Sequence, residues 1–122
     1  MTDRIHEILI VESDQPTVEL YTRELSREYH VLTSATEREV LHLLNTRTIS
    51  AIVLEPASNG GEGRQILAAI SPFVRDHSIP IILCSTLDQR GRGLDAGVAA
   101  YLVKPTLPTA LRDTLRQVIW TH

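Results

Sequence analysis

The sequence is short of several features that define large classes of protein. Its 122 residues include one cysteine, Cys84, so we expect neither an internal disulfide nor a cysteine-based zinc site, and a reducing compartment fits. No apolar run approaches the roughly 18 residues that a membrane helix needs. The N-terminus is polar and then apolar over Ile8–Val11 alone, which is too short for a secretory signal. These absences predict a cytoplasmic protein with no membrane-embedded part.

Excess basic charge and aromatic residues are also lacking. Lys and Arg number 12 against 15 Asp and Glu, so no basic surface predicts that this chain binds nucleic acid. One Trp, one Phe and three Tyr argue against a pair of rings that would sandwich a flat cofactor in a flavodoxin-like manner. No two of the five histidines share a helix face at a metal-ligand spacing. The ordinary hydrophobic content of 43% predicts one globular domain over residues 1–122.

Five short apolar runs alternate with segments of helical spacing. The runs cover residues 8–11, 29–32, 51–54, 79–84 and 99–103. The first, third and fourth are nearly continuous and rich in β-branched residues, as in parallel strands that are covered on both faces. Apolar residues at helical spacing lie between and after these runs: Val18, Leu20, Tyr21 and Leu25; Val40, Leu41, Leu43 and Leu44; Ile66, Leu67, Ile70, Phe73 and Val74; and Leu111, Leu115, Val118 and Ile119 within 107–120.

Capping signals support the same division. Asp14 precedes Gln15-Pro16 and is expected to cap the first helix, since proline is tolerated in a first turn. Thr36 with Glu39 forms a capping-box pattern for the second helix. A weaker helix is expected over 88–96 and would end at Gly97. The order predicts an α/β three-layer sandwich of (βα)5 type, with a parallel sheet and helices on both faces.

Polar residues collect where the predicted strands end. Glu12, Ser13 and Asp14 follow the first strand, Glu55 the third, Ser85 and Thr86 the fourth, and Lys104 and Pro105 the fifth. The carboxyl ends of parallel strands meet at one edge, where ligands of such sheets bind. Carboxylates suit a hard cation, and a lysine with a hydroxyl suits an anionic group. An acid at a strand end can equally be solvated or cap a helix, but convergence from four strands favours a site.

Four motifs carry a resemblance to a known family. They are ILIVESD at 8–14, VLE at 53–55 with Gly63 following, IPIILCS at 79–85 and GVAAYLVKP at 97–105. Over essentially its whole length the chain resembles a response-regulator receiver domain of the CheY-like kind. The resemblance implies a flavodoxin-like fold whose five-stranded parallel sheet has the order 2-1-3-4-5.

The resemblance also implies roles for the polar residues. In the family, an acidic pair after the first strand holds Mg²⁺, and an aspartate after the third strand accepts a phosphoryl group from a histidine kinase. A hydroxyl and a lysine contact the phosphoryl oxygens, and an aromatic residue on the fifth strand changes rotamer on activation. The corresponding residues here are Ser85, Lys104 and Tyr101, and Lys104-Pro105 resembles the family's cis peptide bond.

Two key positions depart from the family pattern. The acidic pair falls on Glu12 and Ser13, and a neutral hydroxyl binds Mg²⁺ far less well than a carboxylate. The phosphoacceptor position falls on Glu55, whose extra methylene moves the carboxylate by roughly 1.5 Å. A displacement of about 1 Å can cost on the order of a hundredfold in rate. We therefore expect weak or no Mg²⁺ binding, no resident cofactor and little phosphorylation.

The departures favour a phosphorylation-independent pseudo-receiver of two-component signalling, which is an interaction module and not an enzyme. Glu55 is expected to pair with Lys104, either imitating part of the phosphorylated state or only neutralising the lysine. The alternative is a Mg²⁺-dependent phosphoacceptor that takes phosphate on Glu55 or Asp14. The asparagine-glycine loop at 59–61 lacks the Lys-Ser/Thr that follows a nucleotide-binding glycine loop.

The resemblance places partner binding on the face made by the helix at 88–96, the strand at 99–103 and the helix at 107–120. That face would bind an output domain or a separate protein, and a homodimer is a further candidate assembly. Arg90 and Arg92 belong either to the partner-binding surface, where they would meet an acidic patch, or to a solvated loop. The chain is either a single-domain regulator or a piece of a larger protein.

Overall fold

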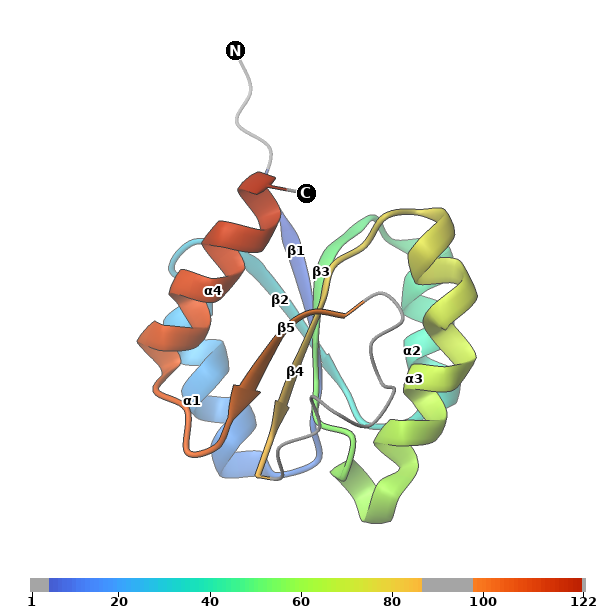
Figure 1. Cartoon of the computed structure of the whole chain (residues 1–122), viewed down its shortest axis with the longest axis horizontal. Coiled ribbons are helices and arrows are strands. Elements are labelled where there is room, and N and C mark those ends of the chain that lie inside the picture. The colour runs from blue at the N-terminus through green and yellow to red at the C-terminus, as the bar shows by residue number, and fades with distance from the viewer. Residues whose placement is uncertain (1–4, 87–97, 122) are drawn as a thin grey trace.

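The computed structural model describes residues 5–86 and 98–121, and strands and helices alternate in it from β1 to β4 (Figure 1). In chain order the elements are β1 (Glu7–Val11), α1 (Gln15–Leu25), β2 (His30–Ser34), α2 (Glu37–Thr46), β3 (Ile49–Leu54), α3 (Ser58–Asp76), β4 (Ile81–Ser85), β5 (Val98–Val103) and α4 (Pro108–Thr121). The helix expected over 88–96, its end at Gly97, and the residues Arg90 and Arg92 lie outside the described residues.

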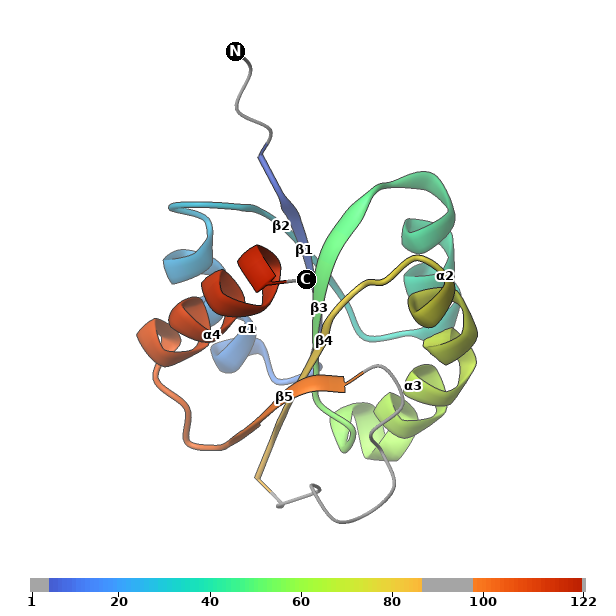
Figure 2. The ribbon, with the colours of Figure 1, turned by 45° about the horizontal axis from the view of Figure 1, so that its top comes forward.

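The strands form one parallel sheet in the order β2-β1-β3-β4-β5. Helices α1 and α4 cover one face of the sheet and α2 and α3 cover the other, which makes three layers (Figure 2). The predicted fold class and strand order are therefore confirmed. Among the described helices, none combines the length and the apolar character that a bilayer span requires.

The core explains why the central strands contain nearly continuous apolar runs. Ile8 and Ile10 of β1 pack toward α1 and α4, whereas Leu9 and Val11 pack toward α2 and α3. Alternate side chains of a strand point to opposite faces, so a strand that is covered on both faces needs a continuous apolar run. All of these side chains are fully buried.

Both predicted N-caps are present. The Asp14 carboxylate accepts hydrogen bonds from the backbone N–H and the hydroxyl of Thr17, at 3.2 and 2.5 Å. The Thr36 hydroxyl accepts the backbone N–H of Glu39 at 3.3 Å. Each bond satisfies a donor that the first turn of a helix would otherwise leave unpaired. These caps fix where α1 and α2 begin, directly after the polar ends of β1 and β2.

Two details of the sequence prediction were wrong. Leu20 was expected on the buried face of α1, but its side chain is 51% exposed while Val18, Tyr21 and Leu25 are buried. Positions 18 and 20 lie about 200° apart on a helix, so they cannot share a narrow face. The second strand was expected at 29–32 but covers His30–Ser34, because its pairing with β1 continues to Val11 opposite Ser34.

Candidate functional site at the carboxyl ends of the strands

The ends of β1, β3, β4 and β5 bring the predicted polar residues to one edge of the sheet. The backbone N–H of Glu55 donates to the carbonyl oxygen of Val11 at 3.0 Å, which places Glu55 beside the end of β1. The backbone N–H of Lys104 donates to the carbonyl oxygen of Ser85 at 2.7 Å, which places Lys104 beside the end of β4. Glu12, Glu55 and Ser85 are all buried.

A buried ion triplet joins three of these residues. The Lys104 ammonium lies 2.5 Å from Glu12 Oε1 and 3.1 Å from Glu55 Oε1. The three side chains are only 14%, 6% and 7% exposed, respectively. The expected pairing of Glu55 with Lys104 is thus present, and Glu12 is a second partner of the same amine. The triplet has one positive and two negative charges.

The surroundings of Lys104 act on its charge in opposite directions. Burial by itself would lower the pKa of the Lys104 ammonium, because desolvation disfavours the charged form. The hydrogen bond and the attraction from Glu12, followed by those from Glu55, outweigh burial and raise the Lys104 pKa above its ordinary value. The amine therefore remains charged at neutral pH.

The remaining carboxylate oxygens of the triplet also accept hydrogen bonds. Glu12 Oε2 accepts the backbone N–H groups of Ser13 and Asp14, at 3.0 and 3.1 Å. Glu55 Oε2 accepts the backbone N–H of Ala57 at 3.0 Å. Each carboxylate is consequently held by the turn that follows its own strand and by the lysine from β5, which fixes its orientation.

Ser13 and Asp14 do not join the triplet. The exposed Ser13 hydroxyl accepts the backbone N–H of Asn59 at 2.9 Å, so it tethers the turn that opens α3. Asp14 is exposed and engaged in its cap, and the hydrogen bonds from Thr17 lower the pKa of its carboxyl group. The prediction that Asp14 caps the first helix is confirmed.

The donor set does not fit a resident Mg²⁺ in this arrangement. Each carboxylate oxygen of Glu12 and Glu55 already accepts a bond from a protein donor. Mg²⁺ prefers carboxylate oxygens and parts with its water reluctantly, and here it would have to bind beside the Lys104 ammonium, whose positive charge opposes a second cation. Over residues 5–86 and 98–121, no three His, Cys, Asp or Glu side chains are grouped so that they could hold a metal ion.

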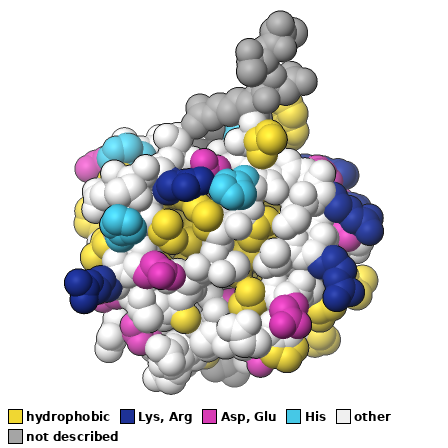
Figure 3. All heavy atoms as spheres, turned by 180° about the vertical axis from the view of Figure 1, so that it is seen from behind, with side chains coloured by type: hydrophobic (Ala, Val, Ile, Leu, Met, Phe, Trp, Pro, Cys, Tyr) yellow, Lys and Arg dark blue, Asp and Glu magenta, His cyan; other side chains and the backbone are white. Residues whose placement is uncertain are grey.

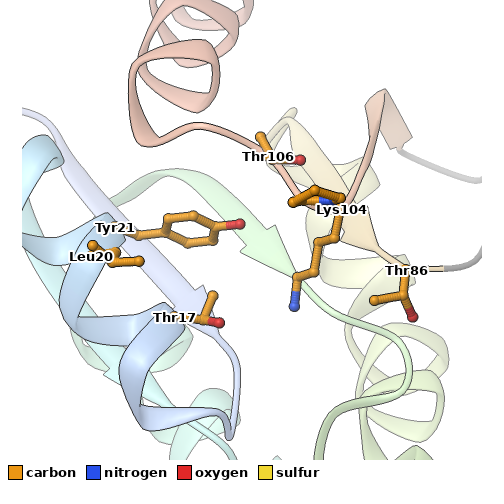
Figure 4. Close-up of a pocket in the computed structure, with 7 residues that line it drawn as sticks. Thr17, Leu20, Tyr21, Thr86, Lys104 and Thr106 are labelled. Atoms are coloured by element: carbon orange, nitrogen blue, oxygen red, sulfur yellow. The ribbon is translucent and has the colours of Figure 1, made fainter.

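A cavity of about 350 Å³ opens beside Lys104 (Figure 4). It is lined by Thr17, Leu20, Tyr21, Thr86, Lys104, Pro105 and Thr106. The Tyr21 ring projects from α1 toward Lys104 and Thr106. Its hydroxyl lies 3.3 Å from Cys84 Sγ, and burial, followed by this contact, raises the Tyr21 pKa. Sequence reasoning missed Tyr21 and Thr106 here, since only their place in the fold brings them to the lysine.

Other residues singled out in the sequence have structural positions near the triplet. Gly63 is required where it stands, because a Cβ added there would lie 2.1 Å from the Glu55 carbonyl oxygen. The Tyr101 hydroxyl is buried, and its ring packs against the core cluster on the α2–α3 side. The Lys104-Pro105 peptide bond is cis, as the resemblance implied. Asn59, Gly60 and Gly61 all have positive φ inside α3, which was not predicted.

Comparison with known proteins identifies the family. Residues 8–116 match the response regulator receiver domain, and the chain belongs to this family. It is 33% identical over 115 residues to the transcriptional regulatory protein HprR of Escherichia coli K12, a match that covers 90% of this chain and 52% of HprR. The chain therefore spans about half of the length of this relative.

Solved structures share the fold. A CheY-like response regulator receiver domain protein from Methanospirillum hungatei superposes with a TM-score of 0.85 at 21% identity, covering 97% of this chain and 96% of that one. Chemotaxis response regulator CheY4 of Vibrio cholerae gives a TM-score of 0.81 at 22% identity, covering 94% and 99% of the two chains. At these identities the likeness concerns the fold alone.

Proposed function

We propose that this chain is a phosphorylation-independent receiver module of two-component signalling, which acts by binding a protein partner and not as an enzyme. Glu55 stands where the family has its phosphoacceptor aspartate. The observation that carries the proposal is the Lys104 ammonium, which lies 3.1 Å from Glu55 Oε1 and 2.5 Å from Glu12 Oε1. The residue that would contact a phosphoryl group already has two buried carboxylate partners.

Two further features support slow or absent phosphorylation. Phosphoryl transfer depends on in-line positioning and on a metal that neutralises developing charge. The longer Glu55 side chain alters the in-line positioning, and Glu55 is held by Ala57 as well as by Lys104. The hydroxyl of Ser13 supplies no negative charge to hold a metal, and it accepts a hydrogen bond from Asn59.

The Glu55–Lys104 pair supports two versions of this function. In the first, the carboxylate imitates part of the phosphorylated state, with a charge of about −1 in place of about −1.5 to −2. In the second, it only neutralises Lys104. The buried hydroxyl of Tyr101 favours the first version, because the ring is packed inward against the core.

We place partner binding on the side of β5 and α4, together with the segment at 88–96. Three large apolar side chains of β5, α4 and the turn between them are exposed: Val103 at 46%, Leu107 at 70% and Trp120 at 85%. These side chains are available for contact with a partner protein on this side of the molecule. An output domain or a separate protein is the expected partner, and a histidine kinase is not needed.

A mass measurement tests the proposal against its alternative, Mg²⁺-dependent phosphorylation on Glu55 or Asp14. The purified chain is incubated with acetyl phosphate and Mg²⁺, and its intact mass is followed with time. We expect no adduct, whereas a gain of about 80 Da within minutes would contradict the proposal.

A restored receiver supplies the matched control. The variant Ser13→Asp/Glu55→Asp is expected to gain metal-dependent phosphorylation, while either single substitution recovers little. Glu55→Gln, which removes the charge and keeps the length, should remain unmodified. If the double variant also stays unmodified, the two departures are not the cause of the loss.

A further inference from the structure

Strand β2 forms one edge of the sheet and, within the described residues, pairs with β1 alone. The backbone N–H of His30 donates to the carbonyl oxygen of His6, and the carbonyl oxygen of Ser34 accepts the backbone N–H of Glu12. Residues two apart in a strand turn their backbone groups to the same side, so His30, Leu32 and Ser34 face β1. The N–H and C=O groups of Val31 and Thr33 therefore point outward.

This edge carries few of the devices that prevent pairing with another strand. It has no proline, no lysine and no bulge in its register with β1. Val31 and Leu32 of this edge are half-buried, and the residues beside them are His30, Thr33 and Ser34. Seen from behind, the molecule exposes hydrophobic side chains among charged side chains of both signs (Figure 3).

A groove of about 460 Å³ runs between this edge and α1. Its lining is Val18, Glu19, Thr22, Arg23, Val31 and Thr33. The Thr22 hydroxyl is buried and has no hydrogen-bond partner among the described residues. A buried hydroxyl without a partner is uncommon, and this one belongs to a residue that lines the groove.

We propose that the chain self-associates through β2, with two copies of the strand pairing antiparallel about a two-fold axis at Leu32. Val31 then lies opposite the second copy's Thr33, and the two residues exchange the backbone hydrogen bonds that each directs outward. Leu32 meets the second copy's Leu32 as a non-hydrogen-bonded pair, where side chains approach most closely. The register uses every outward group of Val31 and Thr33.

Charge on the groove favours a second copy over an unrelated strand. Glu19 and Arg23 are both groove residues of α1 and carry opposite charges. A two-fold axis normal to the sheet sets the two α1 helices antiparallel on the same face. Glu19 of each copy then faces Arg23 of the other, which makes the surface self-complementary. This assembly does not rest on the proposed loss of phosphorylation and uses the edge opposite β5.

Sedimentation velocity over a protein concentration range of about 10 μM to about 1 mM tests the proposal. We expect the weight-average mass to rise toward that of a dimer. Thr33→Pro should abolish the rise, because it removes an outward N–H while leaving the pairing with β1 intact. A cooperative thermal unfolding transition of the monomeric Thr33→Pro variant is the control that it is folded. A wild-type chain that stays monomeric throughout the range would overturn the proposal.

A charge exchange provides an independent test. Glu19→Arg and Arg23→Glu should each weaken the dimer at least tenfold, and the double variant should restore it, since the reciprocal pairs are regained. Arg75→Gln, in the exposed last turn of α3, is the control and should leave the dimer constant unchanged, whereas Trp120→Ala probes the separate surface of β5 and α4. A dimer that is weakened by Trp120→Ala and unaffected by Thr33→Pro would place the interface elsewhere and overturn the assignment.

Discussion

Lys104 sits between two carboxylates that reach it from different strands, and its charge is as much a structural requirement as a functional one. If the ammonium is removed, Glu12 and Glu55 remain as buried like charges. Breaking a buried pair by deleting one partner is strongly destabilising. We expect Lys104→Met to lower the free energy of unfolding at neutral pH by about 3 kcal/mol. Urea denaturation measures this, and an unchanged midpoint would contradict the buried triplet.

The pH dependence of the same variant tests the origin of the effect. Because the Lys104 pKa is raised in the folded state, the ammonium contributes stability fully below its ordinary value of 10.5, and this is lost as pH rises through the folded value. The difference in unfolding free energy between wild type and Lys104→Met should therefore shrink above pH 10.5. Tyr29, whose pKa is raised by burial and by Glu28, is not influenced by the triplet, so its titration cancels in the difference.

Gly63 offers a residue-scale test of the turn beneath Glu55. A Cβ at this position would lie 2.1 Å from the Glu55 carbonyl oxygen and 2.8 Å from that of Pro56. We expect Gly63→Ala to destabilise the chain by about 3 kcal/mol, as overpacking against backbone does. Gly60→Ala is the control: it has no atom within 4 Å of the added Cβ but a φ of 71°, so a smaller cost of about 1 kcal/mol is expected. Equal losses in a chemical denaturation series would contradict the contact.

At the scale of elements, ion pairs join α4 to α1 and to the turn that follows α1, on one face of the sheet. Arg112 Nη1 lies 2.9 Å from Glu24 Oε2, and Arg116 contacts Glu28. We expect Arg112→Gln to lower the melting temperature. In the Arg112→Gln background, the further substitution Glu24→Gln should then lower the melting temperature only slightly. A double-mutant cycle measures this coupling, and Asp113→Asn, at a largely exposed neighbour, should have little effect. Additive losses would show that the pair does not act as a unit.

How far elements could be predicted depended on how local their determinants are. The caps at Asp14 and Thr36 are set by residues three positions apart, and both were predictable. The end of β2 was not, because Thr33 and Ser34 are polar and join the strand only through the neighbouring β1. The left-handed turn at Asn59–Gly61 was missed as well, since its tether is Ser13, a residue 46 positions away.

At the scale of the whole molecule, the alternation of apolar runs and helical segments was enough to predict the layers. It could not predict the cavity beside Lys104, because Tyr21 and Thr106 come from separate elements that meet only when α1 and α4 pack on the same face. The convergence of Glu12, Glu55 and Lys104 was predictable because the ends of parallel strands must share an edge.

The contribution of α4 to stability can be measured by comparing a buried leucine of this helix with an exposed leucine directly before it. Leu115 is fully buried in the cluster on the α1–α4 side, whereas Leu107 is 70% exposed. We expect Leu115→Ala to cost about 3 kcal/mol in unfolding free energy and Leu107→Ala less than about 0.5 kcal/mol. Denaturant unfolding of the two variants measures both values, and a comparable loss in Leu107→Ala would mean that the start of α4 is buried in solution.

The contacts of the Lys104 side chain also affect how the edge of the sheet unfolds locally. Its backbone follows the edge strand β5, yet its amine is bonded to Glu12 after β1, on the far side of β3 and β4. If β5 separated from β4, the two carboxylates would be left without their counter-charge in the protein interior. The edge strand β5 therefore cannot fray by itself. Amide hydrogens of β5 and those of the turns after β1 and β3 should then exchange with deuterium together, in one subglobal step, instead of from the margin inward.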